Sequence, residues 1–148
     1  MSYSLDVNVL LYASDVASSH HAQANEFLAR CASGDDLLCL AWPTVSSYLR
    51  IATHPAIFRR PLSHAEAGRN VGALLRLRHV RVLAEEEGFW DVYQEVTRDV
   101  PVRGNLVPDA HLAALLRQHG VRTLYTRDRD FLKFRFLDVR DPFRAATA

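Results

Sequence analysis

The sequence predicts an α/β fold in which a parallel sheet carries helices on both faces. Short apolar segments of four or five residues alternate along the chain with longer segments whose apolar residues recur at helical spacing. A helix separates most of the expected strands, and such crossovers join parallel strands. The 148 residues are 49% apolar and contain no repeat or linker, so we expect one domain over residues 1–148.

The chain opens with an expected strand, Ser2–Leu5, followed by a short helix, Asn8–Ser14. Asp6 stands between them in an otherwise apolar run. Burying a lone carboxylate costs free energy unless the group is hydrogen-bonded, paired or bound to a cation. Asp6 therefore either caps the helix or binds a cation at the end of the strand, where open α/β sheets bind their ligands. The neighbouring residues alone leave both roles open.

The middle of the chain continues this alternation. A helix over His20–Ala32 has apolar residues at helical spacing, and the wholly apolar segment Leu37–Leu40 is typical of a buried strand. The next helix begins at Pro43 or Thr44 and ends at Thr53, before a proline. A capping box, formed by Ser63 and Glu66, then begins a helix that extends to about Leu77.

The last third repeats the same order of elements. Val80–Leu83 alternates apolar and basic residues, as a strand does, and the acidic run Glu85–Glu87 favours the start of a helix because it complements the helix dipole. Pro108 begins a helix that ends before Gly120. The final expected elements are a strand over Val121–Tyr125, a short turn or helix over Asp128–Phe131 and an edge strand over Phe136–Val139.

Composition excludes several classes of protein. No apolar run is long enough to span a bilayer and no signal peptide is evident, so we expect a cytoplasmic protein without a membrane segment. Cys31 and Cys39 lack the spacing of a metal or redox site. The net charge of +1 does not indicate a nucleic-acid binder, although all the basic residues except Lys133 are arginines. Arginine suits phosphate contacts, but a GC-rich coding sequence would give the same bias.

Three acidic residues share one position in the predicted topology. Asp6 ends the first strand, Asp128 follows the strand Val121–Tyr125, and Asp109 lies at the start of the preceding helix. If the two strands are neighbours, the three side chains meet at the C-terminal edge of the sheet, with Asp130 in reach. Clustered carboxylates repel and raise one another's pKa, and a divalent cation with a preference for oxygen ligands, Mg²⁺ or Mn²⁺, relieves that repulsion.

These acidic positions lie in three segments that resemble the signature regions of PIN-domain ribonucleases, in particular the VapC-type toxins of type II toxin–antitoxin systems. The segments are Asp6-Val7-Asn8, Asn105–Ala114 and Thr126–Phe131. A fourth segment, Leu49–Pro55 with Ile57-Phe58 and Pro61–Ser63 after it, resembles a mycobacterial-type branch of these toxins. Each motif is short, but their order and spacing cover essentially the whole chain.

The resemblance implies a sheet of order 3-2-1-4-5 and a Mg²⁺-dependent endoribonuclease that inhibits translation, with Mn²⁺ able to substitute. It implies that Asp6, Asp109 and Asp128 hold the metal, with Asp130 as a further acidic member of the catalytic set. Asn8 and Thr126 would orient those carboxylates by hydrogen bonds. One position departs from the family: Ser47 stands where a glutamate is expected, so we expect one well-held cation, with any second recruited by the substrate phosphate.

The resemblance also implies an RNA substrate and protein partners. We expect Arg50, Arg127 and Arg129 to lie nearest the RNA phosphates. Single-stranded loops are the usual targets of sequence-specific RNA readers, so a tRNA anticodon loop is the favoured substrate and an rRNA loop the second. A VapB-type antitoxin would restrain the enzyme by docking a helix in a groove, and we expect a homodimer. His111 is expected to be structural. The histidines expected at the surface are His20, His21 and His54.

Two other functions remain as alternatives. The first is a phosphoacceptor receiver domain, which also gathers aspartates and Mg²⁺ at a sheet edge. It requires a phosphoacceptor aspartate after the third strand and a lysine near the end of a late strand. No aspartate ends Val80–Leu83, and Lys133 is badly placed because it follows the loop that contains Asp128 and Asp130. The second is a catalytically degenerate PIN domain that only binds RNA or a partner, which the presence of Ser47 keeps open.

Overall fold

Five short parallel strands form one sheet in the computed structural model, which describes residues 1–144. The strand order is β3-β2-β1-β4-β5. Their bounds are Ser2–Leu5 for β1, Leu37–Ala41 for β2, Val80–Leu83 for β3, Thr123–Tyr125 for β4 and Asp138–Arg140 for β5. This order confirms the predicted sheet, and it excludes the receiver domain, whose strands follow the order 2-1-3-4-5.

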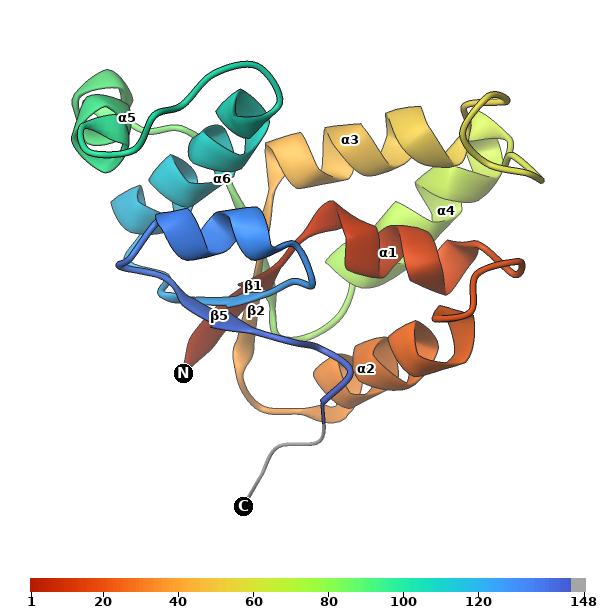
Figure 1. The fold of residues 1–148 in the computed structure, drawn as a ribbon. Coiled ribbons are helices and arrows are strands. Elements are labelled where there is room, and N and C mark those ends of the chain that lie inside the picture. Colours follow the sequence, from red (N-terminus) through yellow and green to blue (C-terminus); the bar gives the residue numbers. More distant parts are fainter. Residues whose placement is uncertain (145–148) are drawn as a thin grey trace.

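The helices cover both faces of the sheet, as predicted (Figure 1). One face carries α1 (Val7–Ser14), α2 (His21–Ser33), α3 (Trp42–Ala52) and α4 (His64–Leu75). The other carries α5 (Phe89–Thr97), α6 (Leu106–Gln118) and the short 3-10 helix η1 (Arg129–Lys133). Within residues 1–144, no helix is long and apolar enough to cross a membrane.

Strand β2 shows why its sequence is apolar throughout. Leu38 and Leu40 pack in the core beneath α1 to α4, whereas Cys39 and Ala41 pack in the core beneath α5 and α6. Successive side chains of a strand point to opposite faces, so a strand covered on both sides needs apolar residues at every position. The sheet is therefore held between two layers of helices, with its C-terminal edge left for a site.

Helix starts differ from the predicted positions where a local contact decides them. Helix α1 begins at Val7, one residue early, because the Asp6 carboxylate accepts a hydrogen bond from the Val7 amide at 2.7 Å. Helix α5 begins at Phe89 and leaves the acidic run Glu85–Glu87 outside, because Gly88 adopts a left-handed conformation with φ of 82°. The expected start of α5 at the acidic run was therefore wrong.

The C-terminal elements also shift. Helix α6 begins at Leu106, two residues before Pro108, and a proline in the first turn removes no intrahelical hydrogen bond. Strand β5 starts at Asp138, because Thr123 of β4 pairs with Asp138 and Phe136 packs against the core instead. The remaining boundaries differ by one or two residues, which is the usual variation at helix and strand ends.

Candidate metal centre

Strands β1 and β4 are neighbours, and their register brings the first acidic residue to the sheet edge. Leu5 pairs with Tyr125, and the Asp6 amide donates a hydrogen bond to the Tyr125 carbonyl at 3.0 Å. The residues after the two strands, Asp6 and Thr126, therefore leave the sheet side by side. Helix α6 precedes β4 and runs against the strands, so its first turn, which contains Asp109, lies at the same edge.

Three carboxylates meet at this edge: Asp109, Asp128 and Asp130. One oxygen from each lies within 4.8 Å of the others, and we call this group the acid triad. The turn into η1 sets the spacing of two of them, because the Asp128 carboxylate accepts a hydrogen bond of 2.9 Å from the Asp130 amide. The first turn of α6 and the turn after β4 thus bring three carboxylate oxygens together.

Asp6 occupies a different place from the acid triad, although it is close to it. Its side chain is only 7% exposed, and both of its oxygens accept hydrogen bonds. Oδ1 accepts from the Val7 amide at 2.7 Å, while Oδ2 accepts from the Thr126 hydroxyl at 2.9 Å and from Asn8 Nδ2 at 3.4 Å. Asp6 is therefore a helix cap as well as a carboxylate at the site.

Thr126 links Asp6 to the acid triad. Its hydroxyl donates to Asp6 and at the same time accepts a 2.9 Å hydrogen bond from the Asp128 amide. The side chain is 3% exposed, so water cannot readily replace either bond. Thr126 and Asn8, which were expected to orient the site carboxylates, both donate hydrogen bonds to Asp6, and Thr126 makes the shorter bond.

Burial and mutual repulsion raise the pKa of two of these carboxyls. The pKa of Asp109 rises from 3.8 to about 7, first because the group is desolvated and then because Asp128, Asp6 and Asp130 repel its charge. Burial also raises the pKa of Asp6, although the hydrogen bonds from Thr126 and Val7 oppose the shift. Without a bound cation the site therefore resists carrying all of its negative charges together.

A small cleft of about 90 Å³ opens between Asp6 and Asp109. Thr44 and Ser47 of α3 line it, together with His111 of α6. Ser47, the residue that stands where the family has glutamate, thus faces the same space as two of the site carboxylates. A glutamate there would place a fourth carboxylate at the cleft, and the serine hydroxyl leaves that position neutral.

Two basic side chains beside the site, His111 and Lys133, contact carboxylates. His111 is hydrogen-bonded through Nε2 to the carboxylate of Glu85, and this bond lowers the pKa of Glu85. Lys133 lies 3.2 Å from Asp130 across one turn of η1. His111 therefore lines the cleft and also fastens α6 to the segment after β3.

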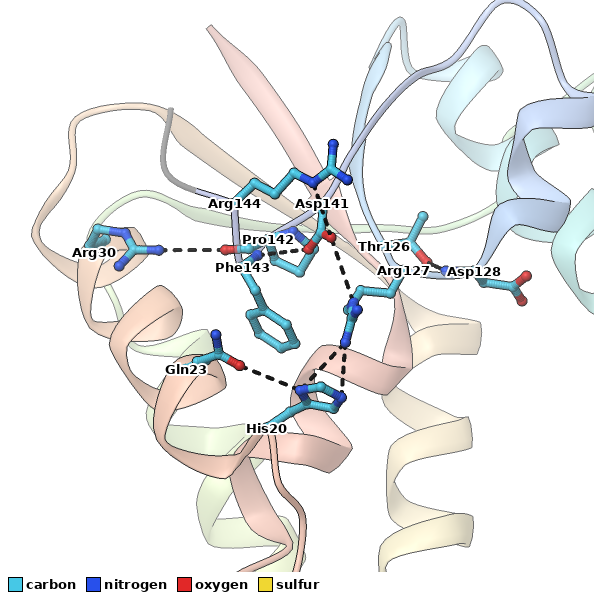
Figure 2. A network of polar contacts seen from close by, with 10 residues as sticks. All are labelled: His20, Gln23, Arg30, Thr126, Arg127, Asp128, Asp141, Pro142, Phe143 and Arg144. Atoms are coloured by element: carbon cyan, nitrogen blue, oxygen red, sulfur yellow. Dashed lines mark hydrogen bonds and ion pairs between the residues drawn. The ribbon is translucent and has the colours of Figure 1, made fainter. Parts of the chain in front are cut away.

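The predicted RNA-binding arginines lie in three different surroundings. Arg50 is exposed in the last turn of α3, and Arg129 is exposed directly after Asp128. Arg127 turns away from Asp128, as Figure 2 shows, and its Nη1 donates a hydrogen bond to Nε2 of His20 at 2.9 Å. His54 is exposed, and His20 and His21 are partly exposed at the surface, although both make hydrogen bonds there.

Sequence reasoning did not find the residues that hold Arg127. Asp141 lies 3.6 Å from its Nε, and the ring of Phe143 lies 5.5 Å from its guanidinium carbon. His20 is 107 positions away in sequence, and nothing in its local pattern marks the contact. Only the fold brings the start of α2 and the segment after β5 to the same side chain (Figure 2).

The donor set fits a divalent cation with a preference for oxygen. Three carboxylate oxygens converge, no thiol or imidazole is among them, and Lys133 is the one basic side chain that pairs with the acid triad among the described residues. Carboxylate groups of this kind hold Mg²⁺ or Mn²⁺, with water completing the coordination. The pKa of Asp109 is raised first by burial and then by the neighbouring carboxylates, and a bound cation would relieve that repulsion.

Comparison with known families agrees with this geometry. The model of the PIN domain family matches residues 3–137. Ribonuclease VapC48 of Mycobacterium tuberculosis is 45% identical over 143 residues, which are 97% of this chain and 99% of that protein. The relative therefore spans the same length and contains the same kind of domain.

Solved structures share the fold at lower identity. The structure of Mycobacterium tuberculosis VapC20, described as a sarcin–ricin loop cleaving toxin, has a TM-score of 0.68 and 18% identity, and the match covers 93% of this chain and 98% of that one. VapBC2 from Rickettsia felis, bound to a DNA fragment from their promoter, has a TM-score of 0.68 and 14% identity over 95% and 98% of the two chains. Together with the family match and the relative at 45% identity, these findings show that the chain belongs to the PIN-domain family, among the VapC ribonucleases.

Proposed function

We propose that this protein is the toxin of a VapBC-type toxin–antitoxin system and hydrolyses RNA with the help of Mg²⁺. The acid triad is the observation that carries the proposal, because Asp109, Asp128 and Asp130 offer three oxygens within 4.8 Å at the sheet edge. Oxygen-only ligand sets suit Mg²⁺, and Mn²⁺ substitutes for it. Hydrolysis of an exposed RNA loop would inhibit translation.

One cation is held before RNA binds. The acid triad supplies one cluster of oxygens, and Ser47 leaves the opposite wall of the cleft without a carboxylate. A second cation then requires oxygens from the scissile phosphate. Asp6 holds the metal together with Asp109 and Asp128, either directly or through a water molecule. Both of its oxygens also accept hydrogen bonds from the protein.

The chemistry follows from these roles. When bound, the cation lowers the pKa of a coordinated water and stabilises negative charge on the scissile phosphate. An aspartate of the site aligns that water as a general base, and Thr126 and the Val7 amide hold the Asp6 carboxylate in place for such a role. In-line attack on phosphorus releases the 3′-oxygen as a hydroxyl and leaves a 5′-phosphate. The reaction does not use the RNA 2′-hydroxyl, so it needs no histidine pair.

The substrate is an RNA whose bases are accessible in a loop. Arg50 and Arg129 are exposed and free to contact phosphates, and Arg127 presents the remaining face of its guanidinium. A tRNA anticodon loop is the favoured target and an rRNA loop the second. The sarcin–ricin loop named for VapC20 is of the second kind. Both are compact loops that display unpaired bases to a protein.

A VapB-type antitoxin and a second copy of the chain are the proposed protein partners, and the proposed location is the cytoplasm, where the RNA is. A groove of about 370 Å³ lies between α1, α2 and α4, and apolar residues such as Leu10, Leu28 and Leu74 line it together with the polar side chains of Asn25 and Asn70. Its dimensions suit the apolar face of a helical segment, which is the docking mode expected of the antitoxin. An antitoxin arginine or lysine that reaches the acid triad would compete with the metal.

The alternative function is an inactive PIN domain that binds RNA without cleaving it, and Ser47 is the observation that favours it. The test is to incubate the purified, antitoxin-free protein with total cellular RNA in Mg²⁺ or in EDTA and to map the fragment ends. Discrete Mg²⁺-dependent cuts with 5′-phosphates support the enzyme and name its target. An absence of cuts in Mg²⁺ and in Mn²⁺ supports the binding module. An Asp6→Asn variant that keeps RNA affinity but loses cuts separates binding from catalysis.

A further inference from the structure

A groove of about 480 Å³ runs between α2 and the segment that follows β5. We call it the α2 groove. Three aromatic side chains line it, Phe27, Tyr125 and Phe143, and two arginines stand at its rim, Arg30 and Arg144. Its size is that of a small-ligand site, and the groove lies apart from the small cleft at the carboxylates.

Arg127 lies between Phe143 of the α2 groove and Asp128 of the acid triad (Figure 2). Arg127 directly precedes Asp128, and its guanidinium lies over the ring of Phe143 at 5.5 Å (Figure 2). Figure 2 shows Asp128 and Phe143 on opposite sides of Arg127. A nucleotide chain that places one phosphate at the acid triad would thus meet Arg127 next and then the wall of the α2 groove.

The hydrogen bonds of Arg127 leave donors for such a phosphate. Nη1 donates to His20 Nε2 at 2.9 Å, which requires His20 to carry its proton on Nδ1, and Nε lies 3.6 Å from the Asp141 carboxylate. Within residues 1–144 no hydrogen bond engages Nη2. The guanidinium is therefore held in place on one side and retains two N–H groups on the other.

The aromatic rings beside Arg127 form a platform. The ring of His20 stacks on that of Phe143 at 5.3 Å with an interplanar angle of 23°, and Tyr12 meets His20 edge-on at 5.0 Å. Such an arrangement fixes the orientation of Phe143 before any ligand binds. Single-stranded RNA is bound in this way, with bases stacked on aromatic rings and phosphates held by arginine.

Polar groups at the α2 groove suit a nucleobase as well. The amide oxygen of Gln23 lies 3.4 Å from His20 Nδ1, which leaves the amide N–H groups of Gln23 and the carboxylate of Glu26 as a donor and an acceptor for a base edge. The charges nearby are Arg30, Arg127 and Arg144 against Glu26 and Asp141, so cations are in excess. Asp141 pairs with two of these arginines and orients them, without cancelling the excess.

We propose that the α2 groove binds one unpaired nucleotide of the RNA next to the cleavage site, with the base against Phe143 and its phosphate on Arg127. This inference rests on the proposed ribonuclease function and adds a specificity site to it. The base in this position would be selected by Gln23 and Glu26. The groove would thus contribute to the choice of the cleaved loop, while the acid triad performs the chemistry.

Steady-state cleavage of a single-stranded RNA oligonucleotide that spans a mapped cut tests the proposal. Phe143→Leu keeps the apolar contact with His20 and removes the aromatic face. We expect KM to rise about tenfold, at the lower end of the effect of losing one stacked base. We expect kcat to stay the same and Phe143→Tyr to restore KM. Arg69→Ala, which removes an exposed arginine of α4, is the matched control and should leave both constants unchanged.

A binding measurement makes the test independent of catalysis. The wild-type protein in EDTA is titrated with AMP, GMP, CMP and UMP, and the side-chain amide resonances of Gln23 are followed by NMR. Saturable shifts that disappear in Phe143→Leu support nucleotide binding in the α2 groove. If the same protein cuts no RNA, the absence of cleavage rejects only the proposed ribonuclease function. Absence of shifts, or cleavage with an unchanged KM in Phe143→Leu, would overturn the nucleotide site while leaving the ribonuclease in place.

Discussion

The hydroxyl of Thr126 donates a hydrogen bond of 2.9 Å to the carboxylate of Asp6, across two neighbouring parallel strands. The same hydroxyl accepts a bond from the Asp128 amide. One buried side chain thus fixes the relative positions of the first and last acidic segments, which are 120 residues apart in sequence. The geometry of the site depends on this contact as much as on the carboxylates themselves.

Replacing Thr126 by valine should damage both stability and activity. Valine keeps the shape but leaves a buried Asp6 oxygen and the Asp128 amide without their partner. We expect the free energy of unfolding to fall by about 1 to 3 kcal/mol and cleavage to fall by about 10- to 100-fold. Urea unfolding and RNA cleavage measure the two effects, and Thr126→Ser should recover most of both. Full activity in Thr126→Val would show that the hydroxyl does not orient the site.

Without metal, the protein should become less stable as the pH rises from about 4 to 7. The pKa of Asp109 is about 7 in the folded protein and near 3.8 in the unfolded chain, so the folded state holds the additional proton within this interval. Raising the pH removes that proton and exposes the repulsion from Asp6, Asp128 and Asp130. Thermal unfolding in EDTA should therefore give a falling Tm, and Asp109→Asn should flatten the dependence.

Adding Mg²⁺ should reverse this trend. The cation competes with the proton at Asp109, so the increase in Tm on adding Mg²⁺ should be larger at pH 8 than at pH 6. Thermal unfolding curves recorded in Mg²⁺ and in EDTA at each pH measure this increase in Tm. An equal increase at the two pH values, or the same increase in Asp109→Asn, would mean that Mg²⁺ stabilises the protein at some other place.

Introducing a glutamate at Ser47 should create a second metal position. The side chain faces the cleft that Asp6 and Asp109 line, so a new carboxylate there adds to their negative charge. We expect the RNA-free wild type to bind one Mn²⁺ tightly and Ser47→Glu to bind two, at the cost of a lower Tm in EDTA. Isothermal titration calorimetry gives the stoichiometry. Two tight Mn²⁺ sites in the wild type would refute the single-cation proposal. The control for the loss of the serine hydroxyl is Ser47→Ala, which adds no carboxylate and should still bind one Mn²⁺.

Stability away from the site should be separable from activity. Ser63 caps α4, because its hydroxyl accepts a 3.1 Å hydrogen bond from the Glu66 amide, and the Glu66 carboxylate in turn accepts a 2.8 Å hydrogen bond from the Ser63 amide. Ser63→Ala should lower the free energy of unfolding by about 1 kcal/mol and leave the cleavage rate unchanged below the unfolding temperature. A parallel loss of cleavage would show that α4 takes part in the reaction.

The sequence predicted the sheet, its order and the segments that carry the acidic residues. These features depend on local patterns, namely apolar strands, helical spacing and motif order, together with the family resemblance. It did not decide between the two roles of Asp6, which caps α1 and also lies at the site. Nor did it indicate that Asp130, rather than Asp6, completes the group of three converging oxygens, since the 3-10 turn after Asp128 sets that spacing.

The surroundings of Arg127 show a second limit. Its sequence position beside Asp128 predicts a phosphate contact, and gives no sign that His20, Asp141 and Phe143 hold its guanidinium. Those partners come from the start of α2 and from the segment after β5, and no periodicity or motif connects these parts. Contacts of this kind depend on how the helices pack on the sheet, which local pattern does not specify.

The most direct test of the metal centre is a crystal of the protein soaked in Mn²⁺ and measured at a wavelength that gives anomalous signal from manganese. We predict one strong anomalous peak within coordinating distance of Asp109 and Asp128, on the side of Asp130, and its loss in a crystal of Asp128→Asn. A well-ordered site with no peak among these carboxylates, in a protein that cleaves RNA in Mn²⁺, would contradict the account.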